Sequence, residues 1–294
     1  MATQKAGSQP STVLGRQLGD ELRRYREAAR LSTDQAADAL ECTKGKISRI
    51  ENGRASLRAP DLAALLAAFG VEDPSVRERL GRLAREAGRR RRNGWWNQYG
   101  PVLADTYRDY IALEAIAESL HTFQAQLVPG LLQTADYARA VTVASQHWQE
   151  ADEIEQFVSA RLARQQRLTD EPTLHLWAVL SEAVLLQRVG GAMVMRDQLA
   201  HLASASELPN VTLQILPFER GAHASMFGPY VVLGFPQKSA LDVVLADNPT
   251  GSVWLEREPE VARYRALFDA ARTSALSPVE SLALIHCRAE EHRT

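Results

Sequence analysis

Apolar residues in the first part of the chain recur at spacings of three and four, the pattern of a helix that buries one face. The first such stretch begins near Val13, and its apolar positions are Leu14, Leu18, Leu22, Tyr25 and Ala29. Two further helices are expected after Pro60 and after Pro74, because proline is favoured in the first turn of a helix. This part of the chain is therefore predicted to be all-α.

Between the first stretch and Pro60 lie the signals of two short helices. Ser32, followed three residues later by Gln35, has the spacing of a capping box at a helix N-terminus. Thr43 is an N-cap candidate for the second helix, and Asn52-Gly53 is a typical C-terminal stop. The pattern predicts two capped helices joined by a tight turn, which is a helix-turn-helix arrangement.

A different pattern follows residue 100. Helical periodicity is expected over residues 105–119, 136–146, 150–168, 192–205, 259–274 and 278–288. Short apolar and β-branched runs predict strands over residues 174–180, 211–218, 230–235 and 242–246. Strands that alternate with helices and then follow one another favour a mixed α/β (α+β) domain.

These patterns predict a multidomain chain. We expect an all-α helix-turn-helix domain over residues 13–80, a basic and aromatic linker over residues 81–100, and a mixed α/β domain over residues 101–294. The longest apolar run, residues 62–71, is far shorter than the ~20 residues of a membrane span. The N-terminal segment has no apolar core, unlike a secretory signal, so we expect a cytoplasmic protein with no membrane partner.

The charges are divided unevenly along the chain. Residues 1–92 contain 19 Lys and Arg against 12 Asp and Glu, a balance of +7. Subtracting these from the chain totals of 34 and 36 leaves 15 against 24 for residues 93–294, a balance of −9. A basic module joined to an acidic one predicts a nucleic acid as the partner of the first module and a separate task for the second. The helix-turn-helix arrangement makes double-stranded DNA the expected nucleic acid.

The second capped helix carries the residues that we expect to contact DNA. A helix of this kind lies in the major groove, where its first turns reach base edges. The expected groove-facing set is Lys44, Gly45, Lys46, Ser48 and Arg49. Arg49 is the candidate for a bidentate contact to guanine, whereas the lysines reach base edges or phosphates. The alternative is a solvated face of an ordinary helical bundle, which the charge balance disfavours.

Three neighbouring features have two interpretations each. Arg54 and Arg58, after the stop signal, either contact phosphates or are merely exposed. The four arginines of residues 89–92 either bind phosphates of any sequence or form a solvated helix end that complements the helix dipole. Trp95 and Trp96 either stack on a base or, as we expect, anchor the packing at the start of the second domain.

The stretch LSTDQAADALECTKGKISRIENGR resembles the helix-turn-helix of the xenobiotic-response-element (XRE) family, whose fold is lambda-repressor-like. The resemblance adds Thr33, at the start of the first of these helices, to the DNA-binding residues. Thr43, the N-cap candidate of the second helix, is also expected to contact DNA. Thr33 replaces a phosphate-contacting glutamine common in the family, and Gly45 stands where relatives often place a base-contacting side chain. Arg26 and Glu51 match a family pair that ties the first helix to the recognition helix.

A second set of motifs extends the resemblance over the rest of the chain. WW, VPGLLQT.DYARA, R..RQ..L, E.VL, VGG...M..QL..L and LPF..GAH occur together between residues 95 and 223. In combination they resemble the Scr-type, antitoxin-like transcriptional regulators of actinobacteria, in which an XRE helix-turn-helix precedes a C-terminal domain of unknown function. The resemblance implies a regulator, such as a repressor, that binds or controls a small partner protein encoded nearby.

The C-terminal module shows no motif of an enzyme. It lacks a G-x-S-x-G elbow, an H-E-x-x-H helix, a phosphate-binding loop and a cluster of His and Cys ligands. We therefore expect no enzymatic activity, no cofactor and no metal. His223, in the Gly-flanked stretch GAHASMFG, is either a structural histidine or a ligand-binding group. A DNA-tethered enzyme, the least favoured hypothesis, would place His223 at its centre.

The stretch LVPGLLQTADYARA predicts an apolar run, a Pro-Gly bend and a helix capped by Thr134. We interpret it as a fold or docking device. The alternative is a partner-binding surface, for which Gln133, Tyr137 and Arg139 are the candidates expected to be exposed.

The leading hypothesis is a sequence-specific DNA-binding transcriptional regulator that acts as a homodimer on half-sites ~34–36 Å apart. In this hypothesis the C-terminal domain dimerises, senses a small ligand or holds a partner protein. In the alternative, the C-terminal domain sequesters a partner protein, and DNA binding serves mainly autoregulation.

Overall fold

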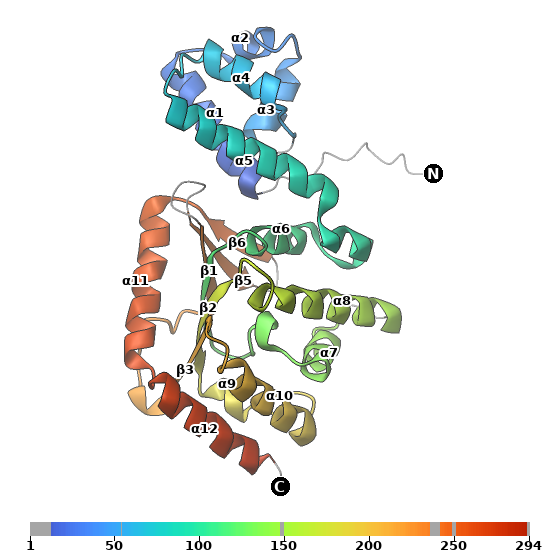
Figure 1. Cartoon of the computed structure of the whole chain (residues 1–294), viewed down its shortest axis with the longest axis vertical. Helices are drawn as coiled ribbons and strands as arrows, with labels where there is room; N and C mark the ends of the chain where they lie inside the picture. The colour runs from blue at the N-terminus through green and yellow to red at the C-terminus, as the bar shows by residue number, and fades with distance from the viewer. Residues whose placement is uncertain (1–12, 54, 148–149, 236–241, 249–250, 293–294) are drawn as a thin grey trace. The chain divides into compact units, whose positions relative to one another are not determined.

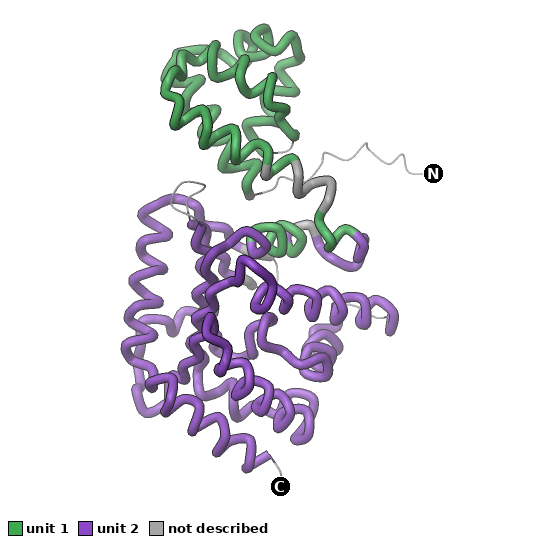
Figure 2. The backbone as a smooth tube through the Cα atoms, viewed as in Figure 1, with its two compact units in different colours: residues 1–97, 107–113, 237–240 green, residues 98–106, 114–236, 241–294 purple. Residues whose placement is uncertain are grey.

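The computed structural model describes residues 13–292, except for residues 54, 148–149, 236–241 and 249–250. The chain divides into two compact units (Figure 2). The first unit consists mainly of the chain up to Asn97 together with Tyr107–Leu113, and the second consists mainly of the residues from Glu114 onward. The first unit is all-α and the second is mixed α/β, so the predicted fold classes are confirmed.

Within its described residues, the first unit is built on helices that share one core (Figure 1). They are α1 (Val13–Ala28), α2 (Thr33–Asp38), α3 (Lys44–Glu51), α4 (Ala59–Ala68) and α5 (Pro74–Asn93). Each helix contributes a residue that is at most 2% exposed, and these are Leu22, Ala36, Ile47, Leu65 and Leu80. The periodic apolar positions of the sequence therefore close a single small core.

Helix α5 extends into the expected linker. Residues 81–93 belong to this helix, because the buried Leu83 and Ala84 continue the apolar stripe that begins at Leu80. A 3-10 segment, η1 (Trp95–Val102), follows. The basic and aromatic stretch is thus helical over most of its length.

The second unit is organised around a six-stranded mixed sheet with the strand order β3-β2-β1-β4-β5-β6. Strands β1, β2 and β3 are parallel, and the pairs β1–β4, β4–β5 and β5–β6 are antiparallel. The strands are β1 (Ser119–Gln124), β2 (His175–Ser181), β3 (Val211–Leu216), β4 (Tyr230–Gly234), β5 (Val243–Asn248) and β6 (Gly251–Leu255).

Helices cover both faces of this sheet (Figure 1). On one face, α11 (Glu258–Ser274) buries Val261, Phe268 and Ala271 against strand residues such as Phe123 and Val179. The helices of the opposite face are α7 (Ala135–Ala144), α8 (Ala151–Arg164), α9 (Ala183–Leu186) and α10 (Ala192–Ala205), with the 3-10 segments η2 (Gly130–Leu132) and η3 (Gln165–Leu168).

The remaining elements are α6 (Asp105–Glu114), η4 (Phe218–Arg220) and α12 (Pro278–Glu291). The start of α12 closes the outer edge of β3. The Ile215 amide donates to the Ser281 hydroxyl at 2.8 Å, and the Ile215 carbonyl accepts from the Leu276 amide at 2.9 Å. Among the described residues, no helix combines the length and the apolar character needed to cross a membrane.

Some predicted helices and strands have the bounds seen in the structure, and others differ from it. The helix expected over residues 192–205 has those bounds, whereas the one expected over residues 105–119 ends at Glu114. It ends early because Ser119 already pairs with strands β2 and β4. Strands β1 and β6 were not predicted, since each is a run of only five or six residues that leaves little periodic signal.

Candidate DNA-binding surface

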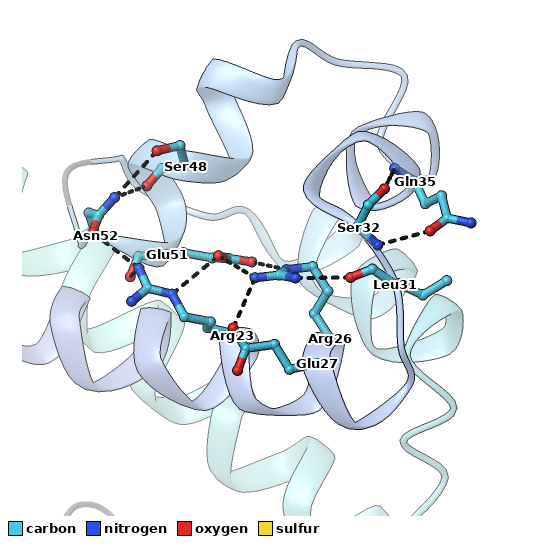
Figure 3. Close-up of polar contacts among 9 residues, drawn as sticks. All are labelled: Arg23, Arg26, Glu27, Leu31, Ser32, Gln35, Ser48, Glu51 and Asn52. Carbon is cyan, nitrogen blue, oxygen red and sulfur yellow. Dashed lines mark hydrogen bonds and ion pairs between the residues drawn. The ribbon is translucent and has the colours of Figure 1, made fainter.

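Helix α2 begins with the capping box expected from the sequence. The Ser32 hydroxyl accepts a hydrogen bond from the Gln35 amide at 3.2 Å, and the Gln35 side-chain oxygen accepts one from the Ser32 amide at 2.8 Å (Figure 3). Two amides that a helix start leaves without partners are thereby satisfied. Ala36 and Ala37 are buried, so this short helix has a fixed start and a fixed inward face.

Helix α3 packs closely against α1 because glycine stands at both contacts. A Cβ atom on Gly19 of α1 would lie 2.4 Å from the carbonyl oxygen of Glu51. Gly53, just after α3, has a φ of +66°, and a Cβ atom there would lie 2.4 Å from the backbone nitrogen of Arg16. With Ile47 in the core, α3 presents its opposite face outward.

A buried ion pair between Arg26 of α1 and Glu51 of α3 holds the two helices together. Nε of Arg26 lies 2.6 Å from Oε1 of Glu51, and Nη2 lies 3.1 Å from Oε2 (Figure 3). Arg26 also donates to the Leu31 carbonyl at 2.9 Å, and Arg23 donates to the Glu51 carbonyl at 3.3 Å. The hydrogen bond with Glu51 raises the pKa of Arg26. The pair therefore lies on the buried side of α3, where it orients the helix and does not reach its outward face.

The outward face of α3 holds the residues that we expect, from the sequence, to enter the major groove. Four of them are exposed, namely Lys44, Gly45, Ser48 and Arg49. The fifth, Lys46, is half-buried. Among the described residues, the Arg49 guanidinium has no hydrogen-bond or ion-pair partner. An Arg without a protein partner has the N–H donors of its planar guanidinium available to a ligand.

The two lysines of this face are not free. Nζ of Lys44 lies 2.9 Å from a carboxylate oxygen of Asp34 in the first turn of α2. Nζ of Lys46 lies 3.4 Å from a carboxylate oxygen of Asp61 in the first turn of α4. Both candidate DNA contacts are therefore paired with acidic residues of the neighbouring helices.

The two threonines expected to contact DNA differ in their surroundings. Thr33 is the first residue of α2 and is half-buried. Thr43 is the exposed N-cap of α3, and its side chain makes no capping hydrogen bond. The Thr43 hydroxyl is therefore the better placed of the two to donate to a phosphate.

The neighbouring basic and aromatic features are only partly described. Arg54 lies outside the described residues, as do the side chains of residues 89–92. Arg58 is the exposed N-cap residue of α4. Trp96 is 6% exposed and meets Trp95 edge to face with ring centroids 5.8 Å apart. The burial of Trp96 favours the packing interpretation over base stacking for that residue.

In the second unit, the stretch LVPGLLQTADYARA turns inward, so the expected exposure of Gln133 and Tyr137 is wrong. Tyr137 is fully buried, and its hydroxyl accepts from the Val128 amide at 3.1 Å. Gln133 is 2% exposed and donates to the Val128 carbonyl at 2.7 Å. Buried side chains thus supply hydrogen bonds to the backbone of this loop. Burial also raises the pKa of Tyr137.

Three distant side chains hold the same loop. Nε2 of Gln165 donates to the Gln133 carbonyl at 2.6 Å, and Nε2 of Gln198 donates to the Leu132 carbonyl at 2.7 Å. Arg161 donates to the side-chain oxygen of Gln133 at 2.8 Å. The loop is therefore held in place by side chains of η3, α10 and α8. These contacts favour a structural role for the loop over a partner-binding surface.

Arg139 is the one candidate of this stretch that reaches the surface. Its guanidinium pairs with Asp136 and Glu155, each at 2.5 Å. These partners tie α7 to α8 and leave Arg139 as part of a surface ion-pair network.

Two family models match the chain. A helix-turn-helix domain matches residues 17–80, and a domain of unknown function (DUF5753) matches residues 107–287. The chain belongs to the DUF5753 family. No curated protein and no solved structure shows significant similarity to the chain. The helix-turn-helix match spans α1 to α4 and the start of α5, and it indicates DNA binding.

The DUF5753 domain contains a buried ion pair that the sequence did not reveal. Nε and Nη2 of Arg164 lie 2.9 and 2.6 Å from the two carboxylate oxygens of Glu114, and the side chains are 4% and 1% exposed. Arg164 belongs to the motif R..RQ..L, which was noted, but Glu114 lies 50 residues away in the chain and has no motif of its own. A pair so deeply buried has a structural role.

His223 of the DUF5753 domain has surroundings that favour a structural role. Its Nδ1 accepts from the Ser225 amide at 3.2 Å, and its ring lies 5.4 Å from that of Phe123. Burial lowers the pKa of His223. Among the described residues it has no carboxylate partner, and no group of three His, Cys, Asp or Glu residues there is arranged to hold a metal ion.

Proposed function

We propose that this chain is a sequence-specific, DNA-binding transcriptional regulator of the antitoxin-like Scr type, without enzymatic activity. The observation that carries the proposal is the outward face of α3, where Arg49 is exposed on a helix held from below by the buried Arg26–Glu51 pair. A rigidly held helix with an unpartnered Arg is what base recognition requires, because loosely held side chains lose discrimination.

In this proposal α3 enters the major groove of double-stranded DNA. Arg49 donates to both acceptors of a guanine, while Lys44, Lys46 and the Thr43 hydroxyl contact phosphates or base edges. Gly45 contributes no side chain, so the base pair opposite it is recognised weakly. The expected specificity therefore rests on few side chains in each half-site.

Two copies of the chain act together on DNA. One α3 reads only a short half-site, and a homodimer doubles that length with half-sites ~34–36 Å apart. The DUF5753 domain is proposed to dimerise and to bind a small ligand or a partner protein. Such a ligand changes DNA affinity only if it binds one state of the regulator more tightly than the other.

The decisive experiment selects bound sites from a pool of randomised duplexes with the full-length chain. We expect enrichment of a symmetric site with a guanine in each half. Recovery of an unenriched pool at low and at moderate salt would end the proposal, since it would leave only sequence-independent binding.

An alternative function, sequestration of a partner protein with DNA binding used for autoregulation, is favoured by exposed apolar residues in the DUF5753 domain. Phe218, Met226 and Phe227 are 58%, 64% and 101% exposed, and all three lie in the segment between β3 and β4. Three exposed apolar side chains in one short segment are candidates for a contact with another protein. Co-purification of a small protein encoded beside this gene, lost on Phe227→Ser, would support this alternative.

A further inference from the structure

We propose that Asp34 and Asp61 act as internal competitors of DNA phosphates, holding Lys44 and Lys46 and thereby lowering the affinity of the recognition face for DNA of every sequence. The proposal rests on the proposed DNA-binding function and adds to it two residues that set affinity and leave base preference unchanged.

The geometry places one aspartate on each side of α3. Asp34 lies in the first turn of α2 and Asp61 in the first turn of α4, the two helices that flank α3 in the chain. Their carboxylates reach Nζ of Lys44 and of Lys46 at 2.9 and 3.4 Å. Two of the three cations on the outward face of α3 are therefore neutralised within the protein.

These ion pairs are placed where DNA can compete for them. The side chains of Lys44 and Asp34 are 63% and 65% exposed, and those of Lys46 and Asp61 are 36% and 30% exposed. Exposed pairs of this type contribute little to stability and open readily. A phosphate can therefore take either lysine from its aspartate.

DNA binding then carries an electrostatic cost. If a lysine moves to a phosphate, the ion pair with its aspartate is broken, and that attraction is lost from the free energy of DNA binding. If the lysine stays with its aspartate, one phosphate is not neutralised and its counterions are not released. In both cases the aspartate weakens binding, and the effect does not depend on the base sequence.

The test compares Asp34→Asn and Asp61→Asn with the unmodified full-length chain. The amide of Asn still accepts a hydrogen bond from the lysine, so the helix contacts are kept while the charge is removed. Binding is measured by fluorescence anisotropy with a labelled duplex of mixed sequence over a range of salt concentrations. We expect each variant to bind about three- to tenfold more tightly at low salt, with a salt slope steeper by about 0.9 for each freed lysine.

Matched controls remove a negative charge elsewhere in the same unit. The control variants are Asp38→Asn on α2 and Glu72→Gln between α4 and α5. Both native side chains are exposed, and among the described residues neither pairs with a lysine or an arginine. We expect these variants to change affinity much less. An equal gain in the controls would overturn the proposal, because it would show a general effect of net charge.

A double-mutant cycle separates release of the lysine from simple repulsion. In a Lys44→Gln background, Asp34→Asn should lose most of its effect, because there is no lysine left to free. A gain that persists undiminished in that background would refute the competition mechanism. If the unmodified chain binds no DNA at any salt concentration, the proposed function itself fails; unchanged affinities and slopes in a chain that does bind would reject the competition alone.

Discussion

The guanidinium of Arg26 on α1 and the carboxylate of Glu51 on α3 meet at 2.6 Å, with side chains only 10% and 5% exposed. A charge buried in this way is tolerated only while its partner is present. The pair therefore couples the placement of the recognition helix to the integrity of α1.

We predict that Arg26→Met releases α3 from the domain. The substitution leaves Glu51 buried with only the longer contact from Arg23, and loss of one partner of a buried pair costs about 3–5 kcal/mol. Hydrogen exchange of the α3 amides in the full-length chain should accelerate accordingly.

The matched variant is Arg26→Met combined with Glu51→Leu, which removes both charges. Its α3 amides should exchange more slowly than those of Arg26→Met alone, because no charge is left buried without a partner. If the double variant proves as labile as the single one, the unpaired carboxylate is not the source of the loss.

Replacing Gly45 of α3 and Gly53, just after α3, by alanine should change the unfolding free energy in opposite directions. Gly53→Ala forces a Cβ atom to within 2.4 Å of the Arg16 backbone at a φ of +66°, so we expect a loss of about 1–3 kcal/mol in unfolding free energy. Gly45 is exposed within α3 and a Cβ atom there would lie 3.9 Å from its nearest neighbour, so Gly45→Ala should gain up to ~1 kcal/mol. Urea unfolding followed by circular dichroism measures both, and changes of the same sign would contradict this assignment.

Features fixed by short-range patterns could be predicted from the sequence. The capping box of Ser32 and Gln35 and the bounds of α10 depend on residues a few positions apart, and both were found as expected. The mixed sheet followed from the order of strand-like and helix-like runs, although the partners of each strand did not.

Features fixed by distant partners could not be predicted. Tyr137 and Gln133 look like surface residues in a local pattern, but the loop that contains them is held by Gln198 and Arg161, which lie far along the chain. The pairing of Lys44 with Asp34 was missed for the same reason, because sequence reveals charges and does not reveal which carboxylate a lysine reaches.

Arg49→Ala should relax base preference without abolishing binding. A bidentate contact to guanine contributes about 1–3 kcal/mol of discrimination, so the variant should lose selectivity at one position in each half-site. Arg58→Ala, at the exposed start of α4, serves as the comparison and should weaken binding to all sequences alike. Selection from randomised duplexes tests both variants, and a preference retained by Arg49→Ala would assign the base contact to another residue.

The second unit should lose stability as the pH falls through the titration range of histidine. His121 stacks on Phe268 with ring centroids 4.9 Å apart, and burial, helped by the nearby positive charge of Arg272, lowers its pKa from the ordinary value of 6.5. The unfolded chain therefore takes up a proton near that value while the folded chain resists it, so stability is full above about pH 6.5 and declines below it. Burial also lowers the pKa values of His201 and His223.

The test is His121→Phe, which keeps an aromatic ring against Phe268 and removes one of these titrating groups. The melting temperature of this variant should fall less between about pH 7.5 and about pH 5.5 than that of the unmodified chain. Replacing the exposed His147 by Phe is the control, and an equally flattened profile in that variant would show that His121 is not the titrating group responsible.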